Sequence, residues 1–101
     1  MIRGTTPTFQ LKINDETVDL TNSDNVYVTF AYMGWSLTKT GEDIDVSAQQ
    51  VDVYLSQEET LSFPKGNIDV QINWTFDDGK RACTTIATVK VTKNLIERVL
   101  E

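Results

Sequence analysis

Residues 66–91 decide the fold, and they read GNIDVQINWTFDDGKRACTTIATVKV. In the first half of this stretch, an apolar residue stands at every second position. These residues are Ile68, Val70, Ile72, Trp74 and Phe76. Successive side chains of a strand point to opposite faces of a sheet, so this alternation is typical of a half-buried strand. The run stops at 77–80, where the pair Asp78-Gly79 predicts a tight hairpin with a type I′ turn. The stretch therefore indicates an all-β domain.

The return strand of this hairpin supplies Cys83, Ala87, Val89 and Val91. A two-residue loop at Asp78-Gly79 fixes which residues face each other. The expected pairs are Phe76–Arg81, Trp74–Cys83, Val70–Ala87 and Ile68–Val89. The register stays open between Cys83 and Ile86, because a bulge there would move Ile86 to the other face. Cys83 itself is expected to be a small buried side chain.

The rest of the chain also consists of short apolar runs separated by turn signals. Alternation predicts further strands at 8–13, 18–20, 26–32, 37–40, 44–46 and 51–55. Ser56 and Glu59 form a capping box, which predicts a single helical turn that ends before Pro64. Seven or eight short strands with this turn spacing predict an immunoglobulin-like antiparallel β-sandwich, with a small barrel as the alternative.

The two ends of the chain differ from this pattern. Residues 1–7 contain Gly4 and Pro7 and are expected to form an extended arm, either frayed or added to a partner. The sandwich domain is expected to cover residues 8–92. Residues 93–101 carry a helical stripe, which consists of Leu95, Ile96, Val99 and Leu100. This spacing predicts a short C-terminal helix that packs on its own sheet or on another subunit, because so short a helix is marginal alone.

Met33-Gly34-Trp35 is an unusual loop, because it carries large apolar residues after a strong strand. Trp35 either folds back over the edge of the core or forms an exposed contact patch with Met33. Tryptophan and methionine are enriched in interface cores. The candidate interface residues are therefore Met33, Trp35, Leu95, Ile96, Val99 and Leu100.

The composition of the chain argues against nucleic-acid binding, catalysis and metal binding. The chain has 101 residues, which is one domain, and its net charge of −6 disfavours contact with a nucleic acid backbone. It has no histidine and one cysteine, so no catalytic, cofactor-binding or metal-ligating residues are assigned and no enzyme is expected. Residues 1–7 contain no apolar signal-peptide core, and no apolar run is long enough to span a membrane. Synthesis in the cytoplasm without export or membrane contact is the resulting expectation.

Four segments carry a resemblance to a known family. They are 17–21 (TVDLT), 24–30 (DNVYVTF), 51–60 (VDVYLSQEET) and 70–81 (VQINWTFDDGKR). With them, residues 8–93 resemble small tail-region proteins of phages and prophages of Gram-positive bacteria. They are similar to the immunoglobulin-like N-terminal domain of phage baseplate upper proteins. Those proteins continue into a coiled region and a receptor-facing end, whereas residues 93–101 are only a short tail, so receptor attachment is not implied.

The resemblance implies a non-catalytic structural or assembly protein of a phage tail, located in the virion. Its expected partners are other tail or baseplate proteins and further copies of the same chain. The alternative function is a carbohydrate-binding β-sandwich module. That alternative requires several exposed aromatic side chains on one surface; the candidates are Tyr27, Tyr32, Trp35 and Tyr54.

Overall fold

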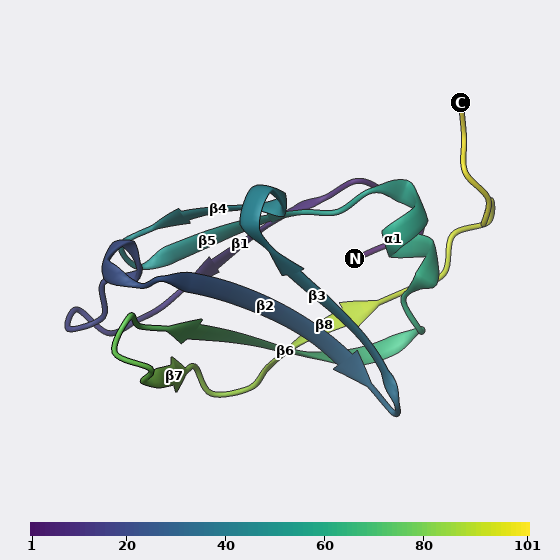
Figure 1. Cartoon of the computed structure of the whole chain (residues 1–101). Helices are drawn as coiled ribbons and strands as arrows, with labels where there is room; N and C mark the ends of the chain where they lie inside the picture. The colour runs from purple at the N-terminus through teal and green to yellow at the C-terminus, as the bar shows by residue number, and fades with distance from the viewer.

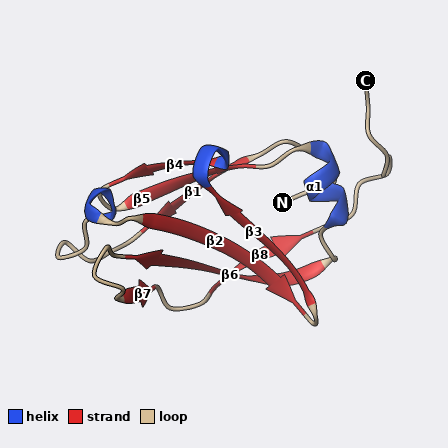
Figure 2. Ribbon diagram, in the orientation of Figure 1, coloured by secondary structure: helices blue, strands red, loops and turns tan.

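The computed structural model describes all 101 residues, and its eight strands form two antiparallel sheets that pack face to face (Figure 1). The predicted all-β sandwich is therefore confirmed (Figure 2). The strands are β1 (Thr8–Lys12), β2 (Asn25–Tyr32), β3 (Trp35–Thr40), β4 (Ile44–Ser47), β5 (Gln50–Tyr54), β6 (Gly66–Thr75), β7 (Arg81–Cys83) and β8 (Ala87–Val91). The helical elements are α1 (Gln57–Ser62) and two 3-10 turns, η1 (Leu20–Asn22) and η2 (Gly41–Asp43). None of these helices has the length and apolar character needed to cross a membrane.

The smaller sheet has the strand order β1-β5-β4. The larger sheet has the order β3-β2-β6, and both β7 and β8 pair with the remaining edge of β6. The molecule is elongated, with extents of 46 × 27 × 22 Å. The hairpin between β6 and β7 lies at one end of its long axis, and α1 lies at the other (Figure 1).

The core lies between the two sheets and contains fourteen buried apolar side chains. They are Leu20, Val26, Val28, Phe30, Ile44, Val51, Val53, Leu55, Phe63, Ile68, Val70, Ile72, Trp74 and Val91. The inward face predicted for Ile68 to Trp74 is confirmed, since Trp74 is 6% exposed. Phe9 and Leu11 of β1 pack against the same cluster but stay half-buried, which leaves one side of the sandwich incompletely filled.

The turn of the β6–β7 hairpin differs from the predicted one. Gly79 has a φ of 86°, but Asp78 has no positive φ, so the type I′ prediction at this turn is wrong. The Phe76 N–H donates to Lys80 O at 2.9 Å, and the Gly79 N–H donates to Phe76 O at 3.1 Å. The loop therefore has three residues, with a glycine in the left-handed region at its last position.

The longer loop shifts the register of β7 by one residue. Trp74 faces Ala82, and Cys83 faces Asn73, so the predicted Trp74–Cys83 and Phe76–Arg81 pairs are wrong. A shift by one residue moves side chains to the opposite face. This explains why Cys83 is exposed, contrary to the buried position expected for it.

A bulge restores the predicted register farther along the return strand. The predicted pairs Val70–Ala87 and Ile68–Val89 are confirmed. Between Cys83 and Ala87 the return strand contains one residue more than β6 does opposite it. Both the backbone N–H and the side-chain oxygen of Thr84 bond to the backbone of Ile72, at 2.9 and 3.1 Å. Ile86 follows this bulge and is 62% exposed.

The type I′ turn of this protein lies at Met33-Gly34, between β2 and β3. Met33 has a φ of 42° and Gly34 a φ of 90°, and Tyr32 pairs with Trp35 on either side of them. Met33 is the only residue other than glycine with a positive φ, and its side chain is 89% exposed. A Cβ in this conformation costs about 1–2 kcal/mol. Nothing within this chain covers the methionine side chain in return.

Replacement of Met33 by asparagine should therefore raise the free energy of unfolding by about 0.5–1 kcal/mol, because asparagine tolerates the left-handed region. Urea unfolding would measure the change. Met33→Ala is the matched control, since alanine removes the side chain but keeps the strained Cβ. Equal stability of the two variants would contradict this account.

Of the two local predictions near η1 and α1, one is confirmed and the other is wrong. The capping box is confirmed, since Ser56 Oγ accepts the Glu59 N–H at 3.1 Å and Glu59 Oε1 accepts the Ser56 N–H at 2.9 Å. The strand predicted at 18–20 is wrong. Asp19 instead caps the 3-10 turn η1 by accepting the Thr21 N–H at 3.0 Å. A side chain that bonds the nearby backbone competes with strand pairing in this way.

The helix predicted over Leu95–Leu100 is also absent, because no residue after Val91 belongs to a regular element. The apolar spacing predicts a helix only if its stripe packs on something, since an isolated segment of this length does not hold a helix in water. Leu95 is 94% exposed, and Ile96, Val99 and Leu100 are about half exposed. The chain therefore covers the stripe only in part.

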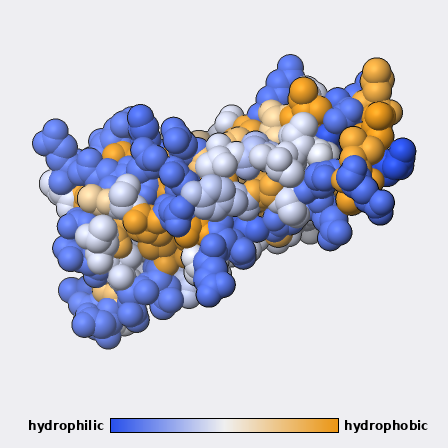
Figure 3. Space-filling model, turned by 90° about the horizontal axis from the view of Figure 1, so that it is seen from above, coloured by the Kyte–Doolittle hydropathy of each residue, from blue (hydrophilic) through white to orange (hydrophobic).

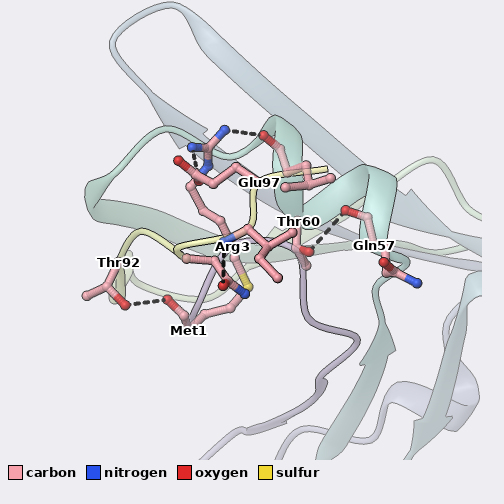
Figure 4. Close-up of polar contacts among 9 residues, drawn as sticks. Met1, Arg3, Gln57, Thr60, Thr92 and Glu97 are labelled. Atoms are coloured by element: carbon pink, nitrogen blue, oxygen red, sulfur yellow. Dashed lines mark hydrogen bonds and ion pairs between the residues drawn. The ribbon is translucent and has the colours of Figure 1, made fainter. Parts of the chain in front are cut away.

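The N-terminal arm is neither frayed nor free. The amino group of Met1 donates to Lys90 O at 2.6 Å, the Thr92 N–H donates to Met1 O at 2.8 Å, and the Arg3 N–H donates to Thr92 O at 3.0 Å. Residues 1–3 therefore lie parallel to the segment that continues β8 (Figure 4). This pairing covers one end of the free edge of β8.

Candidate functional site

The incompletely filled side of the sandwich is a groove of about 550 Å³ between β1 and the bulge that links β7 to β8. Core side chains form its floor, and β1 and the loop after it form one wall. The apolar residues of the lining include Leu11, Ile13, Val70, Ile72, Trp74 and Ala87. The groove exists because the larger sheet ends in a bulged return strand while the smaller sheet ends at β1, so no element closes the space between them.

The backbone of β1 is unpaired on the side of this groove. The Leu55 N–H bonds to Pro7 O, and the Ile13 N–H bonds to Gln49 O at 2.8 Å. Antiparallel strands bond through alternate residues. Because the odd-numbered residues face β5, Thr8, Gln10 and Lys12 direct their backbone groups away from it. Strand β1 is an edge strand of its sheet, so these backbone N–H and C=O groups form no hydrogen bonds with a neighbouring strand.

The rim of the groove carries one charge of each sign, on Lys12 and Asp15. Asp15 accepts hydrogen bonds from the side chain and the backbone N–H of Thr17, at 2.6 and 3.0 Å. These two bonds lower the pKa of the Asp15 carboxyl group, so it stays ionised at neutral pH. The rim can therefore pair with either a cation or an anion brought by a partner.

The tail, residues 93–101, lies at the opposite end of the molecule from this groove (Figure 1). Gln57 holds it by two hydrogen bonds to the backbone of Leu100, at 3.0 and 2.8 Å. The Arg3 guanidinium forms an ion pair with Glu97 and donates to Leu61 O at 2.5 Å (Figure 4). Apart from these contacts the apolar tail residues stay exposed, and apolar atoms gather at this end of the surface (Figure 3).

The structure places the other two candidate interface residues on the β2–β3 hairpin, separate from the tail. Met33 lies at its tip, and Trp35 begins β3. Trp35 is half-buried and packs on Phe63 with a ring-centroid distance of 4.6 Å. Trp35 therefore covers the edge of the core, and only Met33 projects as an exposed apolar side chain. Hairpin tip and tail lie at the same end of the molecule but on opposite sides in Figure 1.

The aromatic side chains required of a carbohydrate-binding surface are not gathered on one face. Tyr54 lies on the smaller sheet, where its hydroxyl bonds to Asp45, and this hydrogen bond raises the pKa of Tyr54. Tyr27 and Tyr32 lie on β2 of the larger sheet. Trp35 is already stacked on Phe63. No flat aromatic platform results from these positions.

A buried ion pair closes the other side of the sandwich, and sequence reasoning missed it. The Lys39 ammonium lies 2.5 Å from Glu59 Oε2 and 3.9 Å from Asp43 Oδ2. The side chain of Lys39 is 7% exposed, and that of Glu59 is 27% exposed. The pair joins β3 of the larger sheet to α1, which follows β5 of the smaller sheet. The sequence could have indicated the burial of Lys39, because Lys39 lies two residues after Leu37 and four after Trp35, on the face of β3 that points towards the core.

The groove was missed for a different reason. Its lining residues come from three separate segments, 10–18, 70–74 and 83–87. Each segment alone has the sequence of an ordinary strand or turn. Only the pairing of strands shows that β1 and the β7–β8 bulge border the same open space.

Comparisons with protein-family models, with curated proteins and with solved structures gave no match for this chain.

Proposed function

We propose that this chain is a non-catalytic structural or assembly protein of a phage tail, in the baseplate region, that acts through protein–protein contacts. Its partners are other tail or baseplate proteins and further copies of itself, and its place of action is the virion. The proposal follows from the family resemblance of the sequence, and it draws support from the arrangement of the strands.

The strand order is the observation that carries the proposal. In an immunoglobulin domain, strands B, E and D form one sheet, and strands C, F and G form the other, with C′ added beside C in the variable type. The order β1-β5-β4 follows B-E-D, and the order β3-β2-β6-β8 follows C′-C-F-G. Helix α1 then lies in the connection between E and F. The resemblance to baseplate upper proteins implies an immunoglobulin-like domain, and this strand order supports that part of the proposal.

The contact surfaces support a role in assembly rather than in ligand chemistry. An unpaired strand edge, a groove with an apolar floor and an exposed apolar tail all occur in one small domain. Natural proteins usually cover such edges or protect them with charges, because an open edge pairs with other chains. Here the edge of β1 carries one charged residue, Lys12, at its end.

Purified phage particles from the strain that encodes this chain provide the test. We expect mass spectrometry to find the chain in the particles at a constant ratio to other tail proteins, or deletion of its gene to stop tail assembly at a defined intermediate. The control is a deletion rescued by the unchanged gene. A chain that is absent from the particles and dispensable for their assembly would contradict the proposal.

A further inference from the structure

We infer that the tail of one copy, residues 93–101, adds as an extended strand to the free edge of β1 in a second copy and buries apolar side chains in the groove. This inference deepens the proposed assembly function and rests on it, because it names a second copy of the chain as a partner. The tail is the donor strand, and the groove with the edge of β1 is the acceptor.

The acceptor offers both parts of a strand-addition site. Backbone groups of Thr8, Gln10 and Lys12 give an incoming strand its hydrogen-bond partners, and the apolar floor of the groove receives its inward side chains. In the immunoglobulin order, strand A lies beside strand B. That position is vacant next to β1 in this chain.

The donor is the segment in which exposed apolar residues are most concentrated. The tail contains four apolar side chains within six residues, Leu95 to Leu100, and Leu95 is 94% exposed. It does not reach its own groove along β8, because residues 1–3 occupy that edge beside Lys90–Thr92. Since donor and acceptor lie at opposite ends of one molecule, the contact is head-to-tail and builds a ring or a filament.

The area of such a contact is large enough for a stable interface. The tail has nine residues, and an extended chain of that size exposes roughly 1,500 Å². Burial of half of this surface removes about 750 Å² from water on the donor, close to the roughly 800 Å² per partner of a standard specific interface.

The charges of donor and acceptor are complementary in either register. Glu97 and Arg98 are adjacent, so a strand points one of them towards the groove and the other away from it. Arg98 can pair with Asp15 on the rim, and Glu97 can pair with Lys12. Each copy carries a net charge of −6, so repulsion between copies opposes association, and added salt should strengthen it.

Two full-length variants separate donor from acceptor. Gln10→Pro removes a backbone N–H that faces the groove and belongs to no internal strand pair, so it disables the acceptor. Gln10→Ala is its control. Ile96→Asp with Val99→Asp places a charge on each face of the tail and disables the donor. Lys93→Gln with Asn94→Asp makes the same change in net charge and is its control. Circular dichroism shows whether each variant keeps the fold.

Sedimentation velocity over a range of protein concentrations gives the readout. The unchanged chain and both controls should associate in a concentration-dependent way. Each disabling variant should lower the association constant by more than about tenfold. Gln57→Ala removes both side-chain bonds to the Leu100 backbone and should strengthen association, because only the Arg3–Glu97 ion pair then holds the tail on its own molecule.

A mixture of the two disabled variants gives the decisive result. The Gln10→Pro chain retains a working tail, and the Ile96→Asp, Val99→Asp chain retains a working groove. Together they should form one heterodimer of twice the mass of a chain, with no growth beyond it. No heterodimer, or an unchanged chain that stays monomeric at every concentration, would overturn the inference.

These outcomes are distinct from failure of the proposed function. If the chain is present in phage particles but monomeric alone, and Gln10→Pro enters the particles normally, the inference is wrong and the proposed function stands. If the heterodimer forms but the chain is neither in the particles nor needed for them, the inference stands and the phage-tail proposal is wrong.

Discussion

Replacement of Trp74 by alanine is expected to lower the free energy of unfolding by about 3–5 kcal/mol. The indole is 6% exposed and lies on the inward face of β6, between Val26 of β2 and Ala82 of β7. Its removal leaves a cavity between the sheets that neighbouring strands fill only in part. Since small domains are stable by about 5–15 kcal/mol, this one change removes a large fraction of the whole stability.

Urea unfolding followed by circular dichroism would measure the effect, and Trp35→Ala is the matched control. Trp35 is the only other tryptophan; it is half-buried and packs on Phe63 at the edge of the core. Its loss should cost clearly less than the loss of Trp74. A cost below 1 kcal/mol for Trp74→Ala would contradict the packing of β6 described above.

Replacement of Glu59 by alanine is the second large effect, with an expected cost of about 3 kcal/mol. Two losses combine. The ammonium of Lys39, which is 7% exposed as a side chain, loses its nearest carboxylate, and Ser56 loses half of the capping box. This cost is at the low end of the range for removing one partner of a buried ion pair. The reasons are that Glu59 is 27% exposed and that Asp43 lies 3.9 Å from the same ammonium.

Two further variants divide this cost between its causes. Glu59→Gln keeps a side-chain acceptor for the Ser56 N–H but removes the charge, so it should cost about 2 kcal/mol. Ser56→Ala removes the cap and leaves the ion pair, so it should cost about 1 kcal/mol. A Glu59→Gln variant as stable as the unchanged chain would show that the ion pair does not stabilise the fold.

The pH dependence of stability gives the same pair an independent test. Partial burial by itself raises the pKa of Glu59, but hydrogen bonds from Lys39 and from the Ser56 N–H outweigh it, so the pKa in the folded state is lowered. A lowered pKa stabilises the fold above the pKa of glutamate in the unfolded chain, about 4.3. This stabilisation is lost as the pH falls through the lower pKa of the folded state. Unfolding of the Glu59→Gln variant should therefore depend less on pH over that acidic window.

Sequence reasoning was most accurate where one local pattern decides the structure. The alternation from Ile68 to Trp74 correctly predicted a buried strand face, and the pair Ser56 and Glu59 correctly predicted the start of α1. Both predictions succeed because each depends only on residues that are close together in the chain. It failed at the two glycine turns. Asp78-Gly79 has the better sequence for a type I′ turn, yet Met33-Gly34 adopts it, because the register of β2 and β3 leaves only two residues to connect them.

The remaining errors involve contacts that a single segment does not specify. The stripe from Leu95 to Leu100 fits a helix, but so short a helix needs a surface that covers its whole apolar face, and this chain covers that face only in part. The open edge of β1 is a property of strand order, which follows from long-range pairing of β1 with β5 and of β2 with β6. The alternation within β1 carries no sign that one of its edges is vacant.

The pairing of residues 1–3 with Lys90–Thr92 has a mechanical consequence. The two segments run parallel, and three backbone hydrogen bonds join them. A force that draws residue 1 away from the tail therefore acts along both segments in opposite directions. It shears the three bonds together instead of opening them one at a time. A domain built in this way bears tension between its two ends without first losing a strand from its core.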